Sequence, residues 1–364
     1  MSSLPSIDLD KLPPYGLVQK EKTAFLLGHL DALTRFHHQA CRPYANIIDS
    51  VYGGLSGVPY ASLEEVPYIP VSLFKERDDM VSVQLTEVFK MLTSSGTTGQ
   101  QVSKIYLDRK TADLQARVLV KIMQHFLGKE RLPMVIFDHP GVLRDRASFS
   151  ARGAGILGMM QFGRQPFYAL RDDMSLDIEG LTAYLEKYAG LRVLYFGFTF
   201  MVWEHAVRVL AKAGNCLSKN NGILIHSGGW KKLEAERVSH AAFADGCKEA
   251  LGVSKVLNFY GMVEQVGGVF FENELGYLQA PVFSDLIIRN PHTLKPVPDG
   301  ETGLIQVVSI LPRSYPGHSL LTADMGRVVG IDDPAAGGYG RYFEVLGRAP
   351  RSETRGCSDT YEQS

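Results

Sequence analysis

The sequence has no excess of charge of either sign. Its 38 basic and 39 acidic side chains give a formal net charge of -1 over 364 residues. Proteins that bind nucleic acid carry a basic patch or stripe, and proteins that bind anionic membrane surfaces carry a dense basic segment. The balance of charge therefore excludes nucleic acid and membrane surfaces from the expected partners.

Long hydrophobic runs are also missing, and cysteine is scarce. No stretch approaches the roughly 18 uninterrupted apolar residues that predict a transmembrane helix, and residues 1–10 are unlike a signal peptide because they are acidic and contain no apolar run. Four cysteines (Cys41, Cys216, Cys247 and Cys357) are too few for a disulfide framework in a chain of this length. We therefore expect free thiols and a cytoplasmic location.

What is present is an alternation of helical and strand patterns. Residues 25–36 repeat apolar side chains at helical spacing, and so do residues 114–126, which precede Gly128, a residue type that commonly follows a helix end. Farther along, short apolar runs alternate with helical stretches, which predicts βα units and a largely parallel sheet. The expected strands are 134–137, 166–170, 192–196, 223–226 and 255–259, and the expected helices are 177–189, 201–213 and 231–251.

After residue 276 the pattern changes to short strands separated by Pro, Gly and Asp turns, which predicts an antiparallel sheet or barrel. These strands are expected at 286–289, 303–309, 319–322 and 342–346. The expected fold class is α/β, with parallel-rich sheets and a smaller antiparallel sheet or barrel. The expected divisions are a helical segment at 1–75, an α/β nucleotide-binding region at 76–275, a β-rich region at 276–348 and a mobile tail at 349–364.

A dense run of hydroxyls and glycines indicates a loop that binds phosphate: Ser94, Ser95, Gly96, Thr97, Thr98 and Gly99. Backbone N–H groups in such a turn can point together at an anion, and the hydroxyls add donors. Residues 88–92 would be the strand that presents it. The run lacks the Gly-Lys-Ser/Thr of a Walker A loop, and an ordinary surface turn is the alternative.

Further nucleotide-binding candidates follow the predicted strands. Tyr260 could stack on a base, Gly261 allows a sharp turn, and Glu264 could bind Mg²⁺ because hard cations take oxygen ligands. Asp324 is suited to accept hydrogen bonds from both hydroxyls of a ribose. Gly228 and Gly229 lie at a Gly-rich strand end, where open α/β sheets bind ligands. The alternatives are a core tyrosine, a solvated glutamate and a turn aspartate.

The order of these motifs resembles the adenylate-forming enzyme superfamily. The motifs are Ser95-Gly96-Thr97-Thr98-Gly99, Tyr260-Gly261-x-x-Glu264, Thr322-Ala323-Asp324-Met325-Gly326 and Gly347-Arg348. The segments 69–75 and 355–357 are similar in particular to the LuxE-type acyl-protein synthetases, which activate fatty acids in bacterial luminescence. The resemblance covers roughly residues 35–360.

The resemblance implies roles for individual residues. The loop around Thr97 and Thr98 would hold the ATP phosphates. Tyr260 would flank the adenine, and Gly228 and Gly229 would line its other side. Glu264 would hold Mg²⁺, Asp324 would bind the ribose, and Arg348 would reach the ribose or a phosphate. Cys357 would receive the acyl group as a thioester and pass it to a partner such as an acyl reductase.

Two departures from the wider superfamily favour the LuxE branch over a CoA ligase. The chain ends 16 residues after Arg348, so most of the usual C-terminal domain and its catalytic lysine are expected to be absent. The usual lysine of the phosphate loop is also out of register, and Lys104 is the nearest one.

Cys357 lies on a polar tail, nine residues after Arg348. An extended segment of that length reaches about 30 Å, which would let a thiolate move between two active sites. An incidental tail cysteine is the alternative. The helical spacing of Phe243, Cys247 and Leu251 indicates a core role for Cys247, and Cys41 has no second ligand pair for zinc.

The leading interpretation is therefore a ligase that uses ATP and Mg²⁺ to activate a carboxylic acid and transfers it to its own Cys357. Transfer to CoA or to a carrier-protein thiol is one alternative, and a nucleotide-binding subunit without turnover is another. Aliphatic, aryl and hydroxylated acids all remain open. A dinucleotide fingerprint at 153–158 is set aside because residues 144–152 form a poor strand, and its small residues are expected to pack a helix.

Overall fold

The computed structural model describes residues 4–94, 101–143, 151–214, 216–230 and 237–349. Contacts group them into two units. Unit 1 contains residues 4–122 and 261–349, and unit 2 contains residues 123–260. The sequence-based division ran in consecutive segments along the chain, whereas unit 1 combines the N-terminal helices with the late strands.

Unit 2 is built on a parallel sheet in the order β5-β4-β6-β7-β8. Its strands are β4 (Leu132–Ile136), β5 (Gly163–Tyr168), β6 (Leu194–Phe198), β7 (Ile223–Ser227) and β8 (Lys255–Tyr260). Each of the five strands predicted between 134 and 259 overlaps one of them. Strands β4 and β6 are buried along their full length, as expected for a parallel sheet covered on both faces.

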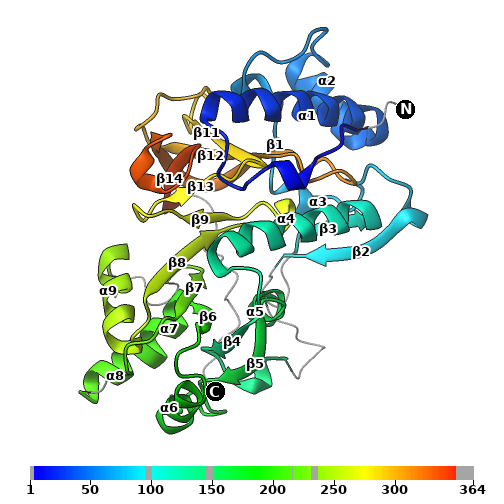
Figure 1. Ribbon diagram of the computed structural model, residues 1–364. Coiled ribbons are helices and arrows are strands. Elements are labelled where there is room, and N and C mark those ends of the chain that lie inside the picture. The colour runs from blue at the N-terminus through cyan, green and yellow to red at the C-terminus, as the bar shows by residue number, and fades with distance from the viewer. Residues whose placement is uncertain (1–3, 95–100, 144–150, 215, 231–236, 350–364) are drawn as a thin grey trace. The chain divides into compact units, whose positions relative to one another are not determined.

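The helices of unit 2 connect these strands (Figure 1). They are a 3-10 helix at Pro140–Leu143, α5 (Ala151–Met160), α6 (Ile178–Lys187), α7 (Thr199–Val202), a π-helical turn at Trp203–Val207, α8 (Arg208–Lys212) and α9 (His240–Leu251). The prediction of a helix from 231 was wrong in its start, because residues 237–239 precede the helix. Ser239 caps α9 by accepting a hydrogen bond from the Ala242 N–H at 3.2 Å.

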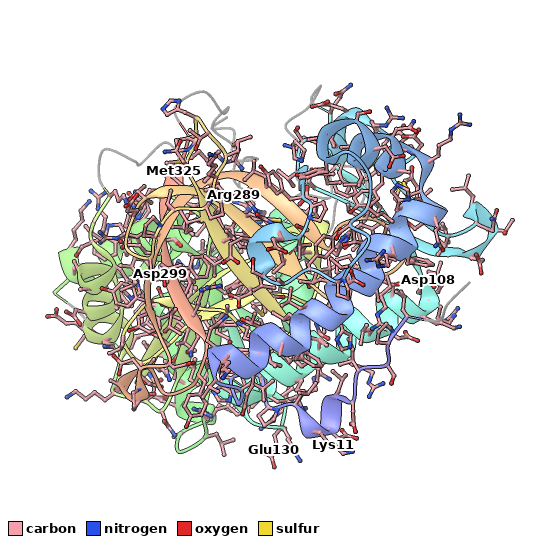
Figure 2. All side chains as sticks on the ribbon, turned by 90° about the horizontal axis from the view of Figure 1, so that it is seen from above. Lys11, Asp108, Glu130, Arg289, Asp299 and Met325 are labelled. Atoms are coloured by element: carbon pink, nitrogen blue, oxygen red, sulfur yellow. The ribbon has the colours of Figure 1, made fainter. Side chains whose placement is uncertain are left out.

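Unit 1 is built on a mostly antiparallel sheet in the order β11-β12-β13-β14-β10-β9, with β1 parallel to β13. The strands are β1 (Ile69–Pro70), β9 (Phe270–Glu272), β10 (Leu278–Gln279), β11 (Ser284–Arg289), β12 (Gly303–Ser309), β13 (Ser319–Ile331) and β14 (Arg341–Arg348). Arg289, Leu304 and Met325 align across β11, β12 and β13, and Figure 2 labels the first and last of them. The predicted antiparallel sheet is thus confirmed.

The remaining elements of unit 1 are helices and a hairpin. The helices are α1 (Gln19–Ala40), α2 (Arg42–Tyr52), α3 (Leu73–Glu76) and α4 (Arg109–Leu127), and α4 continues into unit 2. Strands β2 (Val88–Thr93) and β3 (Lys104–Asp108) pair antiparallel. The helices predicted around residues 25–36 and 114–126 are confirmed, and so is the strand predicted before the hydroxyl-rich run.

Helix α1 lies along the sheet of unit 1 (Figure 1) and is tied to it by buried polar groups. Lys22, 1% exposed, donates to the Ala280 carbonyl at 2.9 Å and lies 3.5 Å from the Asp285 carboxylate on β11. Burial lowers the pKa of Lys22 to about 8 against the opposing effect of Asp285. These long-range contacts explain why the N-terminal helices belong with strands more than 250 residues later.

Candidate active site

The carboxyl ends of the parallel strands of unit 2 lie along one edge of its sheet. Asp138 follows β4, Thr199 follows β6, Gly228 follows β7, and Tyr260 ends β8. Open α/β sheets bind ligands at this edge, because the turns after the strands carry polar and small residues there. The sequence-predicted residues Gly228, Gly229 and Tyr260 are therefore brought to the same edge of unit 2.

The turn after β7 has an unusual backbone at Gly228, whose φ of 87° lies in the left-handed region that favours glycine. Gly228 and Gly229 are both exposed, and a Cβ built at Gly229 would meet no atom of the described residues within 4 Å. The Ser227 hydroxyl donates to the Phe259 carbonyl at 2.9 Å, which ties this turn to the end of β8. The turn therefore leaves open space beside a fixed backbone.

Glu264 is the most constrained site residue of unit 1. It lies in the 3-10 turn Val263–Gln265, and its residue surface is 5% exposed. The Ser103 hydroxyl, itself fully buried, donates to Glu264 Oε1 at 2.5 Å. Burial raises the pKa of Glu264, and the Ser103 hydrogen bond opposes that rise. Ser103 was not predicted from the sequence.

The backbone around Glu264 is held by a second set of buried groups. The Tyr315 hydroxyl donates to the Glu264 carbonyl at 2.9 Å. The Gln265 amide donates to the carbonyls of Val307 at 3.2 Å and Gly317 at 2.8 Å. Tyr315 and Gln265 are almost completely buried, so the carboxylate projects from a rigid support.

The base of the predicted phosphate loop is closed by a serine pair. The Ser94 N–H donates to the Ser103 carbonyl at 3.1 Å, and the Ser103 N–H donates to the Ser94 hydroxyl at 2.8 Å. Ser103 therefore links the loop base directly to Glu264. The remaining predicted loop residues, Ser95, Gly96, Thr97, Thr98 and Gly99, lie outside the described residues. Lys104 donates to Asp78 at 2.9 Å.

Asp324 and Arg348 are register partners on β13 and β14. Arg348 Nε lies 3.6 Å from Asp324 Oδ1, and the two side chains are 36% and 21% exposed. The Asp324 N–H donates to the Thr322 hydroxyl at 3.1 Å. A Cβ at Gly326 would lie 2.4 Å from the Glu344 carbonyl oxygen, so this position in the motif requires glycine for strand packing. The predicted ribose-binding pair is thus adjacent in unit 1.

Comparison with known proteins decides the family. A profile described as "Acyl-protein synthetase, LuxE" matches residues 10–364. The chain belongs to the LuxE acyl-protein synthetase family. Membership makes it an enzyme of the ligase class, which argues against the alternative of a subunit without turnover.

Two bacterial relatives are similar in sequence to this LuxE family member. The long-chain-fatty-acid–luciferin-component ligase of Aliivibrio fischeri is 24% identical over 313 residues, covering 82% of this chain and 78% of that protein. The ligase of the same name from Vibrio harveyi is 22% identical over 314 residues, covering 83% and 79%.

The structural comparisons identify the fold. An open conformation of 2-hydroxyisobutyryl-CoA ligase in complex with 2-HIB-AMP and CoA matches with a TM-score of 0.68 at 18% identity, covering 96% of this chain and 82% of that one. A postadenylation state of that ligase with 2-HIB-AMP matches with a TM-score of 0.67 at 16% identity, covering 94% and 73%. The LuxE family member thus has the fold of adenylate-forming enzymes, as its motifs implied.

The cysteines of this LuxE family member differ in their surroundings. Cys41 and Cys247 are buried, and burial raises the pKa of both thiols. Cys216 is exposed. The predicted core role of Cys247 is therefore confirmed. Cys357, the predicted acyl carrier, lies outside the described residues.

The dinucleotide-like fingerprint at 153–158 does not have the structural context of a nucleotide-binding turn. The glycines of the dinucleotide-like fingerprint lie inside helix α5, where a Cβ at Gly155 would come within 3.1 Å of the Phe198 ring. The expected packing of small residues is therefore seen at Gly155, whereas Gly158 is exposed and a Cβ there would meet nothing within 4 Å among the described residues. Among the described residues, no group of three or more His, Cys, Asp or Glu side chains could hold a metal ion. In the same residues, no helix is long and apolar enough to cross a membrane.

Proposed function

We propose that the enzyme uses ATP to activate a carboxylic acid as an acyl adenylate and then transfers the acyl group to its own Cys357. The buried Glu264 carboxylate, held by Ser103 at the base of the hydroxyl-rich loop, is the observation that carries the proposal. Family membership supports it. The names of the two bacterial relatives support a long-chain fatty acid as the substrate.

In the first step, a carboxylate oxygen of the acid attacks the α-phosphorus of ATP. The bond from that phosphorus to the bridging oxygen breaks, and pyrophosphate leaves. We assign phosphate binding to the loop from Ser94 to Gly99, because its hydroxyls and backbone N–H groups are suited to stabilise the developing charge. Asp324 would accept the ribose hydroxyls, and Arg348 would contact the ribose or a phosphate.

Glu264 suits a Mg²⁺ ion that arrives with ATP. Mg²⁺ is usually held by one or two carboxylates together with substrate phosphates, so a single carboxylate on a rigid support fits this role. When bound, the ion would neutralise charge on the phosphates. Within the chain, the Ser103 hydroxyl favours the ionised form of Glu264 against the effect of burial, and the Tyr315 hydroxyl holds the Glu264 backbone in place.

In the second step, the Cys357 thiolate attacks the acyl carbonyl carbon. The bond between that carbon and the phosphate oxygen breaks, AMP leaves, and a thioester forms. We further propose that a partner such as an acyl reductase then receives the acyl group. The buried cysteines Cys41 and Cys247 are unsuited to this role, because burial raises the pKa of each thiol.

The test separates the two steps. Cys357→Ser should retain acid-dependent ATP–pyrophosphate exchange and lose labelling of the protein by a radioactive long-chain fatty acid. Cys216→Ser is the matched control, because Cys216 is the exposed cysteine among the described residues. It should retain both activities.

Three results would count against the proposal. Labelling that persists in Cys357→Ser but disappears in Cys216→Ser would reassign the acyl carrier. Soluble acyl-CoA formed without any protein adduct would support transfer to an external thiol instead. A wild-type enzyme that shows no acid-dependent exchange with any carboxylic acid would overturn the adenylation step itself.

A further inference from the structure

Two buried polar side chains support the turn after β7. The Thr199 hydroxyl, at the carboxyl end of β6, donates to the Gly228 carbonyl at 2.7 Å and lies 3.2 Å from the Ser227 carbonyl. His226 Nδ1, on β7, lies 2.9 Å from the same hydroxyl oxygen. Thr199 is 6% exposed and His226 is 3% exposed, so neither is a surface group.

The direction of these hydrogen bonds follows from counting protons. Thr199 has one hydroxyl hydrogen, and the short contact to Gly228 uses it. His226 must then carry its proton on Nδ1 and donate to the Thr199 oxygen. Burial lowers the pKa of His226 to about 3, so the ring is neutral. Nε2 is left without a hydrogen-bond partner within the described part of the chain.

Aromatic side chains fix the histidine ring. The centroids of the His226 and Phe243 rings are 4.4 Å apart, and Phe243 also stacks on Trp203 at 5.7 Å. Trp203 begins the π-helical turn, an element often found at functional sites, and a Cβ at Gly246 would lie 2.9 Å from its ring. The packed rings hold His226 in the orientation that aims Nδ1 at Thr199.

The consequence reaches the open side of the turn. The carbonyl of Gly228 and the N–H of Gly229 belong to one planar trans peptide unit, so they point in opposite directions. With the carbonyl held toward Thr199, the Gly229 N–H is turned away from it. Gly229 is exposed, and no described residue fills the space beside it. This geometry presents a donor to a flat acceptor such as a ring nitrogen of a purine.

We propose that Thr199 and His226 are positioning residues that orient the peptide unit between Gly228 and Gly229 for recognition of the base of ATP. The inference rests on the proposed function and adds to it two residues that act without touching the nucleotide. Thr199 holds the carbonyl directly, and His226 holds Thr199.

Isothermal titration of the full-length enzyme with ATP tests the role of Thr199. Thr199→Val keeps the shape but leaves the Gly228 carbonyl without its donor, and we expect roughly tenfold weaker ATP binding. The KM for ATP in the exchange reaction should rise by a similar factor, with kcat much less affected. Thr199→Ser retains the hydroxyl and should bind ATP within about twofold of wild type.

A pair of His226 variants tests the second link. The amide nitrogen of Asn occupies a place close to Nδ1 of histidine, and that of Gln a place close to Nε2. His226→Asn should therefore retain ATP affinity, whereas His226→Gln should lose it. A merely structural requirement for bulk would favour the larger glutamine. Equal loss in both, with unchanged melting temperatures, would remove His226 from the proposal.

The outcomes also separate this inference from the proposed function. Normal exchange by wild type with unchanged ATP affinity in Thr199→Val would overturn the positioning role and leave adenylation intact. ATP binding that weakens in Thr199→Val, in a protein without exchange activity for any acid, would support the positioning role while the adenylation proposal failed. Wild-type protein that binds no ATP would overturn both.

Discussion

The hydrogen bond from Ser103 to Glu264 predicts a change in the pH dependence of catalysis. Burial raises the pKa of Glu264, and the Ser103 hydroxyl opposes that effect. In Ser103→Ala the pKa of Glu264 should rise further, so the carboxylate would hold its proton to a higher pH. The acid limb of the pH profile of ATP–pyrophosphate exchange should therefore move toward higher pH.

The size of the effect follows from the bond. A hydrogen bond to a charged acceptor contributes about 1.5–3 kcal/mol, and each 1.4 kcal/mol is about tenfold in an equilibrium. On the acid limb, the fraction of enzyme with an ionised Glu264 should fall roughly tenfold to a hundredfold. At a pH well above the folded-state pKa of Glu264 in both proteins, the carboxylate is ionised in each and the rates should converge.

The free energy of unfolding should also depend on pH, but it should decrease where the catalytic rate increases. A carboxyl group whose pKa is raised by folding favours the folded state below its ordinary pKa and loses that contribution as the pH rises through the folded value. The free energy of unfolding of Ser103→Ala should therefore fall below that of wild type once the pH exceeds the folded-state pKa of Glu264 in the wild-type protein. In Glu264→Gln this decline with pH should disappear, while exchange activity is lost at every pH.

Ser284→Ala is the matched control. Ser284 is a fully buried serine of unit 1 whose hydroxyl has no hydrogen-bond partner among the residues the structure describes. This variant should keep the wild-type acid limb. An acid limb in Ser103→Ala that coincides with that of Ser284→Ala would show that the Ser103 hydroxyl does not set the protonation of Glu264.

Two further predictions use other parts of unit 1. Asp324→Asn should raise the KM for ATP about tenfold, because the proposed ribose site loses a charged acceptor. The melting temperature should be almost unchanged, because the ion pair of Asp324 with Arg348 is partly exposed. A large fall in melting temperature would indicate a structural role instead. His37 and His318 are stacked, fully buried rings, and burial lowers the pKa of both, that of His37 to about 3. A buried neutral histidine favours the folded state above the ordinary histidine pKa of about 6.5. The free energy of unfolding should therefore fall as the pH drops below 6.5, by at most about 1.4 kcal/mol per pH unit for each ring. Urea denaturation at pH 7 and pH 5 should show a smaller loss for His37→Gln than for wild type, and an identical loss would contradict the account.

The sequence predicted buried strands better than long exposed ones. The strand β7 was recognisable because its apolar residues form an uninterrupted buried run before Gly228. The strand β13 was predicted to end at residue 322 but continues to Ile331. The polar side chains of Asp324 and Arg327 interrupt the apolar pattern by which a strand is recognised in the sequence. The second half of β13 is maintained instead by backbone hydrogen bonds to β12 and β14.

The residues of the candidate site also differ in whether the sequence alone points to them. Local motifs were enough to propose Glu264, Asp324 and the glycine pair as site residues, but Ser103 carries no local signal. It acts on a carboxylate 161 residues away, and only the folded chain brings the two together. Thr199 did have a signal, since it is a polar residue directly after a buried parallel strand. The partnership of Thr199 with His226 required the register of β6 against β7.

Unit 1 is built from two segments that lie far apart in the sequence, and this affects how it can fold during synthesis on the ribosome. Lys22 meets Asp285 only after 263 further residues have been made, which takes on the order of ten to fifty seconds at translation rates of about 5–20 residues per second. Throughout that interval the Lys22 ammonium group lacks the Asp285 carboxylate beside which it is buried in the folded protein. The described strands of unit 2 lie between residues 132 and 260 and can pair before the late strands of unit 1 are made. Truncated products that end near residue 260 would therefore carry the paired sheet of unit 2 together with N-terminal helices that lack the sheet of unit 1.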